Sequence, residues 1–345
     1  MKTKIWSVDK NVEKESTYPQ LQEAANLLQQ GEVVAFPTET VYGLGADATN
    51  EEAVRKIFEA KGRPSDNPLI VHIADQEQLT PLVSSIPPLT QVLMEKFWPG
   101  PLTIIFPSSN HVATRVTAGL DTVAIRMPDH PVAHALLKMA HVPIAAPSAN
   151  VSGRPSPTLA SHVSTDLNGK IAGIVDGGAT GVGVESTVLD ITSDVPTILR
   201  PGGITREQLE EVIGPVLLDK GLQDQSQKPK APGMKYKHYA PKSPLTIVEG
   251  SREYVQQLAS KQEGKKVGIL TTEENADFYQ ADQVLVCGKR ADLATVAAHL
   301  YDTLRKFDEV GVDVIYSESF PREGLGNAIM NRLTKAAGHH IIVEK

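Results

Sequence analysis

The sequence predicts an α/β protein of two domains, each a sheet covered by helices. Over the first two hundred residues, amphipathic stretches alternate with short apolar runs, as helices and buried strands do. The same alternation resumes after residue 244, whereas residues 218–244 lack periodicity and are rich in Pro, Gly, Lys and Gln. A chain of 345 residues also exceeds the roughly 100–200 residues of one domain. We therefore expect a first domain at 1–215, a linker at 216–243 and a second domain at 244–345.

Four amphipathic segments of the first domain predict helices. Thr49 and Glu52 have the spacing of a capping box, and Gly62 follows the last apolar residue of that segment. Thr205 and Gln208 open the last helix of the domain. The expected helices cover 18–30, 49–62, 131–139 and 205–214.

The apolar runs of this domain predict buried strands, because each is four to six residues long and is bounded by Gly, Pro, Ser or Asp. The runs are VVAF (33–36), PLIVHI (68–73), LTIIF (102–106), TVAIRM (122–127), VPIAA (142–146), IAGIV (171–175) and STVLDI (186–191). Together with the helices they predict a mixed sheet that helices cover on at least one face.

The second domain has the pattern of a small Rossmann-like α/β layer. Strand-like runs at 245–250, 265–272, 282–288 and 312–318 alternate with helical stretches. Those stretches cover 251–261, 292–310 and 326–337.

Composition excludes several classes of protein. No apolar run approaches the ~20 residues of a membrane helix, and the basic N-terminus is not followed by the apolar core of a signal peptide. The single cysteine, Cys287, excludes an internal disulfide and a thiolate-rich zinc site. We expect a cytoplasmic protein without a membrane partner. A net charge of −7 argues against a general polyanion binder, although a local basic patch is compatible with it.

A cluster of polar residues surrounds the strand at 68–73. Lys61, Arg63 and Asn67 lie on the loop before it, and His72 lies within it. Lysine offers a point charge and arginine a planar fork, which together suit a polyphosphate at a sheet edge. On their own, these residues also fit a solvated turn with a satisfied core histidine.

Three further loops have ligand-binding composition, and each also has an ordinary structural interpretation. Residues 36–48 fit an anion-binding backbone nest or a simple hairpin, and residues 145–158 fit a phosphate or adenine contact or an unliganded Ser/Pro loop. The glycines of 176–190 match neither a Walker loop nor a dinucleotide fingerprint, but they are compatible with a phosphate-approaching loop of another kind. Arg126 and Arg200 lie in apolar strands, where each needs an internal acid or an anionic ligand as its partner.

Five motifs, taken together and in this order, resemble the YrdC-type threonylcarbamoyl-AMP synthase family. They are PTETVYGLG, KGRPSDNPL, PSANVSGRPS, ESTV and LRPG, and the segment APGMKYKHYAP with the second domain resembles the two-domain form of that family. The resemblance implies a YrdC-like twisted mixed sheet with a central cleft. It also implies synthesis of L-threonylcarbamoyl-AMP and pyrophosphate from L-threonine, bicarbonate or CO₂ and ATP. The product would serve N6-threonylcarbamoyladenosine modification of tRNA beside the anticodon.

The resemblance also implies roles for single residues. Lys61 and Arg63 would be catalytic. ATP would contact Arg63, Asn67, Thr122, Ser148, Asn150, Ser156, Arg200 and Tyr236. L-Threonine would contact Thr40, His72, Arg126, the Ala146 backbone and Ser186.

The family reaction joins two anions, so cations must offset their repulsion. We expect Mg²⁺ to enter with ATP, held mainly by the phosphates, and the protein ligands of the metal are unknown. We also expect the lysine- and tyrosine-rich linker to act as a lid that ATP orders. The product would pass to the tRNA threonylcarbamoyl transferase machinery, without a requirement that this chain bind tRNA itself.

Two alternatives remain at this point. A basic site with a lysine–tyrosine linker also fits an RNA-binding module. A carbamoyltransferase is a second alternative, because hydrogenase-maturation proteins contain a related domain. Those chains carry cysteine-rich zinc fingers, which a lone Cys287 cannot build.

Overall fold

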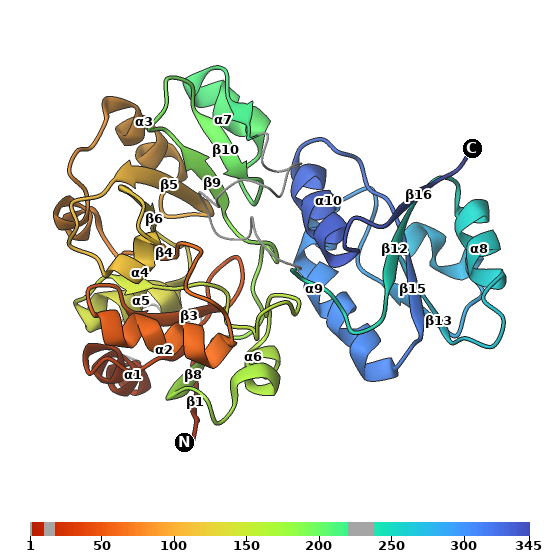
Figure 1. The fold of residues 1–345 in the computed structure, drawn as a ribbon, viewed down its shortest axis with the longest axis horizontal. Helices are drawn as coiled ribbons and strands as arrows, with labels where there is room; N and C mark the ends of the chain where they lie inside the picture. The colour runs from red at the N-terminus through yellow and green to blue at the C-terminus, as the bar shows by residue number, and fades with distance from the viewer. Residues whose placement is uncertain (1, 10–17, 220–237) are drawn as a thin grey trace. The chain divides into compact units, whose positions relative to one another are not determined.

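The computed structural model describes residues 2–9, 18–219 and 238–345 of the chain (Figure 1). The described residues form two compact units. The first comprises 2–9, 18–152, 157–181 and 185–219, and the second comprises 153–156, 182–184 and 238–345. Most of the predicted linker, with Tyr236 and the proposed lid, lies outside the described residues.

The first unit is a mixed sheet with helices packed on it, as the sequence predicts. Its described strands are β1 (Lys4–Ser7), β2 (Val34–Phe36), β3 (Gly43–Asp47), β4 (Ile70–His72), β5 (Leu102–Pro107), β6 (Thr122–Arg126), β7 (Ile144–Ala145), β8 (Gly173–Asp176), β9 (Thr187–Asp190), β10 (Thr197–Arg200) and β11 (Leu217–Leu218). They are ordered β1-β8-β2-β3-β7-β4-β6-β5-β9-β10-β11. Every predicted strand is present, including β10, the apolar strand in which the sequence places Arg200, and β1, β3 and β11 are additional to the predicted runs.

The helices of the first unit include the four predicted ones. They are α1 (Pro19–Gln29), α2 (Glu51–Lys61), α3 (Pro88–Phe97), α4 (Thr114–Thr117), α5 (Pro131–Ala140), α6 (Ala160–Leu167) and α7 (Arg206–Ile213). Two short 3₁₀ turns, η2 (Gln76–Gln78) and η3 (Thr80–Leu82), precede α3.

The predicted cap of α2 is wrong by one residue. Asn50, not Thr49, is the N-cap, and its side chain accepts hydrogen bonds from the backbone N–H groups of Glu52 and Ala53. Thr49 donates its hydroxyl to Asp47 instead. The end of the helix is as predicted, because Gly62 adopts the left-handed conformation with φ of 61°.

The segment 36–48 is a hairpin, the simpler of its two interpretations. β2 and β3 pair antiparallel from Val34 opposite Gly45 to Phe36 opposite Gly43. The connecting residues 37–42 carry the polar part of the PTET motif. A hairpin therefore presents these side chains beside the middle of the sheet, since β3 adjoins β7 and β7 adjoins β4.

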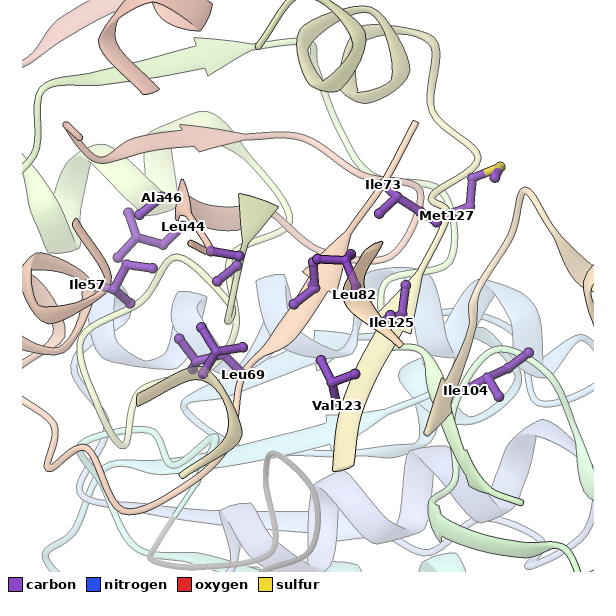
Figure 2. Packing of buried hydrophobic residues seen from close by; sticks show 14 of the residues in the cluster. Leu44, Ala46, Ile57, Leu69, Ile73, Leu82, Ile104, Val123, Ile125 and Met127 are labelled. Carbon is purple, nitrogen blue, oxygen red and sulfur yellow. The ribbon is translucent and has the colours of Figure 1, made fainter. Parts of the chain in front are cut away.

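The main hydrophobic core lies on one face of the central strands, and alternation along β6 defines the other face. Val123 and Ile125 point into the core with residues of α2 and of neighbouring strands (Figure 2). Thr122, Ala124 and Arg126 alternate with them and therefore share the opposite face. The central strands thus have a packed face and a face that carries polar groups.

The second unit is a parallel sheet between helices, which confirms the Rossmann-like prediction. Its strands are β12 (Leu245–Glu249), β13 (Val267–Thr271), β14 (Gln283–Val286), β15 (Val314–Glu318) and β16 (Ile341–Val343), ordered β14-β13-β15-β12-β16. Its helices are α8 (Arg252–Ser260), α9 (Leu293–Val310) and α10 (Leu325–Ala336), with a 3₁₀ segment η5 (Glu273–Phe278). Strand β16 was not predicted.

Segment 153–156 belongs to this second unit. The Pro155 carbonyl accepts a hydrogen bond from Arg305 Nη2 (2.5 Å), and the Gly153 carbonyl accepts one from the Ala240 N–H group (2.9 Å). Among the described residues of both units, none of the helices is long and apolar enough to cross a membrane.

Candidate active site

A buried guanidinium at the end of β6 anchors one part of the candidate site. Arg126 is 3% exposed, and its Nη1 donates to Thr40 Oγ1 (2.9 Å). Its Nε donates to the Gly100 carbonyl (3.3 Å), and its Nη2 lies 2.5 Å from Glu39 Oε1. Each guanidinium nitrogen of Arg126 therefore lies against an internal partner, and Nη2 makes no geometrically sound hydrogen bond among the described residues.

His72 lies beside Arg126, because β4 and β6 run parallel with these two residues in register. Its Nδ1 donates to the Ile70 carbonyl (3.1 Å). Burial, followed by the positive charge of Arg126, lowers the pKa of His72 to about 3. The imidazole is neutral at physiological pH and serves as a hydrogen-bonding group rather than as a cation.

A second arginine lies across the sheet, at the end of β10. Arg200 is 5% exposed and donates from Nε and Nη2 to the Ser186 carbonyl (3.1 and 3.0 Å). Its Nη2 also donates to Ser186 Oγ (3.1 Å), and that hydroxyl lies 2.8 Å from Thr103 Oγ1. After burial and the charge of Arg126, the positive charge of Arg200 also lowers the pKa of His72.

Lys61 ends α2 and fastens the loop after β7. Its ammonium donates to the backbone carbonyls of Ser148 (2.5 Å) and Asn150 (2.7 Å), and the side chain is only 3% exposed. Ser148 Oγ in turn donates to Asn150 Oδ1 (2.6 Å). The lysine charge thus fixes the conformation of the serine–asparagine loop, a role that the sequence did not suggest.

The loop after α2 carries Arg63 and Asn67. Asn67 is fully buried, and its carbonyl lies 3.5 Å from Arg63 Nη2. The Arg63 guanidinium also lies 5.9 Å from the centre of the Phe58 ring. Arg63 and Asn67 therefore lie on the loop that directly follows α2, the helix that ends at Lys61.

An apolar patch lies on the face of the central strands opposite the main core, the face that also carries polar groups. It consists of Ile70, Ile105, Ala124, Val188 and Leu199, from β4, β5, β6, β9 and β10. These residues form a cluster separate from the main core. This face of the sheet therefore carries an apolar cluster together with hydroxyl and cationic side chains.

Four predicted residues need separate comment. Ser156 is fully buried but lies in segment 153–156 of the second unit, and Tyr236 lies outside the described residues. The Ala146 N–H group already donates to the Ile70 carbonyl (2.9 Å). Thr122 lies at the first position of β6, on the same face as Arg126.

Sequence reasoning missed several polar residues of this region. Glu39 pairs with Arg126, Thr38 Oγ1 lies 2.8 Å from Thr40 Oγ1, and Thr103 contacts Ser186. Glu39 and Thr38 belong to the PTET motif, which was a signal for both. Among the described residues, no group of three or more His, Cys, Asp or Glu side chains could hold a metal ion.

Two family models match the chain. A model of Sua5, YciO and YrdC proteins, described as "Telomere recombination", matches residues 26–202. A model described as "Threonylcarbamoyl-AMP synthase, C-terminal domain" matches residues 204–338. The two matches cover most of both units.

Named relatives are similar over almost the whole chain. The threonylcarbamoyl-AMP synthase of Bacillus subtilis is 62% identical, over 99% of this chain and 100% of that protein. That of Pyrococcus abyssi is 50% identical, over 92% of this chain and 94% of that protein. The crystal structure of P. abyssi Sua5 complexed with L-threonine matches with a TM-score of 0.93 and 48% identity, over 99% of this chain and 100% of that chain.

Proposed function

The chain belongs to the Sua5, YciO and YrdC family, and from this membership and its site we infer that it is a threonylcarbamoyl-AMP synthase. One observation within the first unit supports this best. A buried arginine, a neutral histidine and a threonine hydroxyl come together at the ends of β4 and β6. Such a set suits a small amino acid with a carboxylate and a hydroxyl group.

We propose that these groups bind L-threonine, which is the ligand named for the P. abyssi structure. The Arg126 guanidinium would grip the carboxylate, and His72 or Thr40 would recognise the side-chain hydroxyl. A contact of this kind rejects valine more strongly than an apolar pocket would, because valine leaves buried polar groups unpaired. Ser186 and the Ala146 backbone would complete the threonine contacts.

ATP would bind along the polar side of the same strands. The apolar patch around Ala124 offers a surface for the adenosine, and Thr122 lies at the far end of β6 from Arg126. The proposed ATP contacts are Arg63, Asn67, Thr122, Ser148, Asn150, Ser156, Arg200 and Tyr236. Lys61 would act together with Arg63, through its charge and through its hold on the serine–asparagine loop.

We propose nucleotidyl transfer as the reaction class. Threonine and bicarbonate or CO₂ give a carbamate, whose oxygen attacks the α-phosphorus of ATP, and pyrophosphate leaves. Lys61, Arg63 and Arg200 would offset the repulsion between the two anions without forming a covalent intermediate. An Mg²⁺ ion would enter with ATP and be held mainly by its phosphates.

The cellular location, the fate of the product and the domain boundaries are part of the same proposal. We place the enzyme in the cytoplasm and its product with the tRNA threonylcarbamoyl transferase machinery. The boundaries 1–215, 216–243 and 244–345 are proposed as catalytic domain, lid-forming linker and second domain.

The product formed from ATP, bicarbonate and isotope-labelled L-threonine tests the function. Mass spectrometry should show threonylcarbamoyl-AMP carrying the label, with an equal amount of pyrophosphate, and neither should form when threonine is omitted. Pyrophosphate release that does not depend on threonine would contradict the proposal. Salt-sensitive retention of RNA without any adenylate product would instead favour the RNA-binding alternative.

A further inference from the structure

Glu39 is a shielded carboxylate with unmet hydrogen-bonding capacity. Its side chain is 12% exposed, and Oε1 lies 2.5 Å from Arg126 Nη2. Both carboxylate oxygens are shielded from solvent, and within the described parts of the chain neither accepts a geometrically sound hydrogen bond. Leaving a carboxylate in this state is costly, so a ligand that donates hydrogen bonds to it would be favoured.

The pair that Glu39 forms with Arg126 matches the charges of an amino acid. A free α-amino acid carries an ammonium and a carboxylate on one carbon atom. The Arg126 guanidinium suits only the carboxylate of such a ligand. The Glu39 carboxylate, which is in direct contact with Arg126, has the charge that suits the ammonium. Because an ammonium is a strong donor to a carboxylate, the two residues together would bind both halves.

We propose that Glu39 binds the ammonium group of L-threonine and accepts one of its protons. This inference rests on the proposed function and adds a catalytic residue to it. An ammonium nitrogen has no lone pair, so it must lose a proton before it can attack carbon. The ammonium and the carboxylate of threonine share one carbon atom. A threonine carboxylate bound by Arg126 would therefore bring the ammonium close to Glu39, which forms an ion pair with Arg126.

The proton transfer balances with bicarbonate as the carbon source. One ammonium N–H bond breaks, its proton passes to a Glu39 carboxylate oxygen, and the electron pair stays on nitrogen. The amine then attacks the bicarbonate carbon, the C–N bond forms, and the hydroxyl group leaves as water with a second nitrogen proton. The carbamate that results carries the negative charge that then attacks ATP.

Neighbouring titratable groups are less suited to this step. His72 is neutral but a weak base, since burial lowers its pKa to about 3. Asp129 is exposed, and burial together with the negative charge of Glu39 raises its pKa. Arg126 is a permanent cation and cannot itself accept the proton.

Binding of two ligands to Glu39→Gln tests the ammonium contact. L-Threonine is compared with (R)-3-hydroxybutyrate, which has the same carboxylate and hydroxyl group but no ammonium. By titration calorimetry, Glu39→Gln should weaken threonine binding by about 10–100-fold and leave 3-hydroxybutyrate binding unchanged or tighter. Equal weakening of both ligands would mean that Glu39 only holds Arg126, and unchanged threonine binding would also overturn the proposal.

The rate at saturating threonine tests the proton transfer. The Glu39→Gln enzyme should turn over about 100-fold more slowly than wild type at pH 7 and should regain part of this loss at pH 9, where solvent removes the ammonium proton. Glu77→Gln, at an exposed glutamate of η2, is the matched control and should change neither measurement. Turnover equal to wild type would refute the transfer, whereas a wild-type chain that ignores threonine would refute the proposed function itself.

Discussion

The contacts of Lys61 predict that Lys61→Met damages stability and activity together. Methionine keeps much of the apolar stem of lysine but removes the ammonium. The carbonyls of Ser148 and Asn150 then lose their donor. A loop fixed by that ammonium would lose its conformation, and Ser148 is one of the proposed ATP contacts.

The expected loss of stability follows from these carbonyls. A buried acceptor left without a donor costs about 1–3 kcal/mol, and Ser148 is half-buried, so we expect about 2–4 kcal/mol in total. For a domain of this size that corresponds to a fall in the unfolding temperature of roughly 5–15 °C. Lys56→Met is the matched control. Lys56 lies on the same helix and donates to the Gly31 carbonyl (2.9 Å), but its side chain is 32% exposed, and we expect less than about 1 kcal/mol.

Thermal unfolding by circular dichroism and threonine-dependent pyrophosphate release measure the two effects. Lys61→Met should release pyrophosphate at least about 10-fold more slowly, with a larger rise in KM for ATP than for threonine. A Lys61→Met protein that unfolds at the wild-type temperature would refute the loop-fastening role. Wild-type turnover in the same variant would show that the lysine has no part in the reaction.

Three further predictions concern the arginines and His72. Arg126→Met should raise KM for threonine at least about 10-fold more than KM for ATP, because it removes the contact with the threonine carboxylate. Equal rises of the two KM values would contradict the assignment of Arg126 to threonine. Arg200→Lys should lower kcat/KM about 10–100-fold, since an ammonium cannot reproduce the fork that contacts both the carbonyl and the hydroxyl of Ser186; a change below about 2-fold would contradict this. His72 has a pKa lowered to about 3, so between pH 6.5 and 3 the unfolded chain binds more protons there than the folded chain. Its contribution to stability is complete above pH 6.5 and is lost as pH falls toward 3; His72→Gln should therefore show a shallower fall in unfolding temperature over that window, and identical slopes would refute the assignment.

Local patterns in the sequence predicted the central strands and four helices of the first unit, but not α3, α4 and α6. The short apolar run TVAIRM predicted a strand, and in the structure the alternation along that strand places Val123 in the core and Arg126 on the opposite face. Gly62 marked the end of α2 because only a glycine enters the left-handed region without strain. The cap was misplaced because Thr49 and Asn50 are both good caps, and only the fold directs Thr49 to Asp47.

The motifs could be recognised in the sequence, but the contacts between them could not be predicted from it. Lys61 and the Ser148 carbonyl are separated by 87 positions, and Thr40 and Arg126 by 86. What brings them together is the order of strands and their register, such as the parallel pairing that sets His72 beside Arg126. A residue pattern reports which face of its own element is buried, whereas pairing between distant strands is selected by the packing of the whole domain. The chain's composition and periodicity thus determined its architecture and the chemical groups available, and the tertiary structure alone decided that Glu39 lies against Arg126 and that the Lys61 charge is directed to a backbone loop.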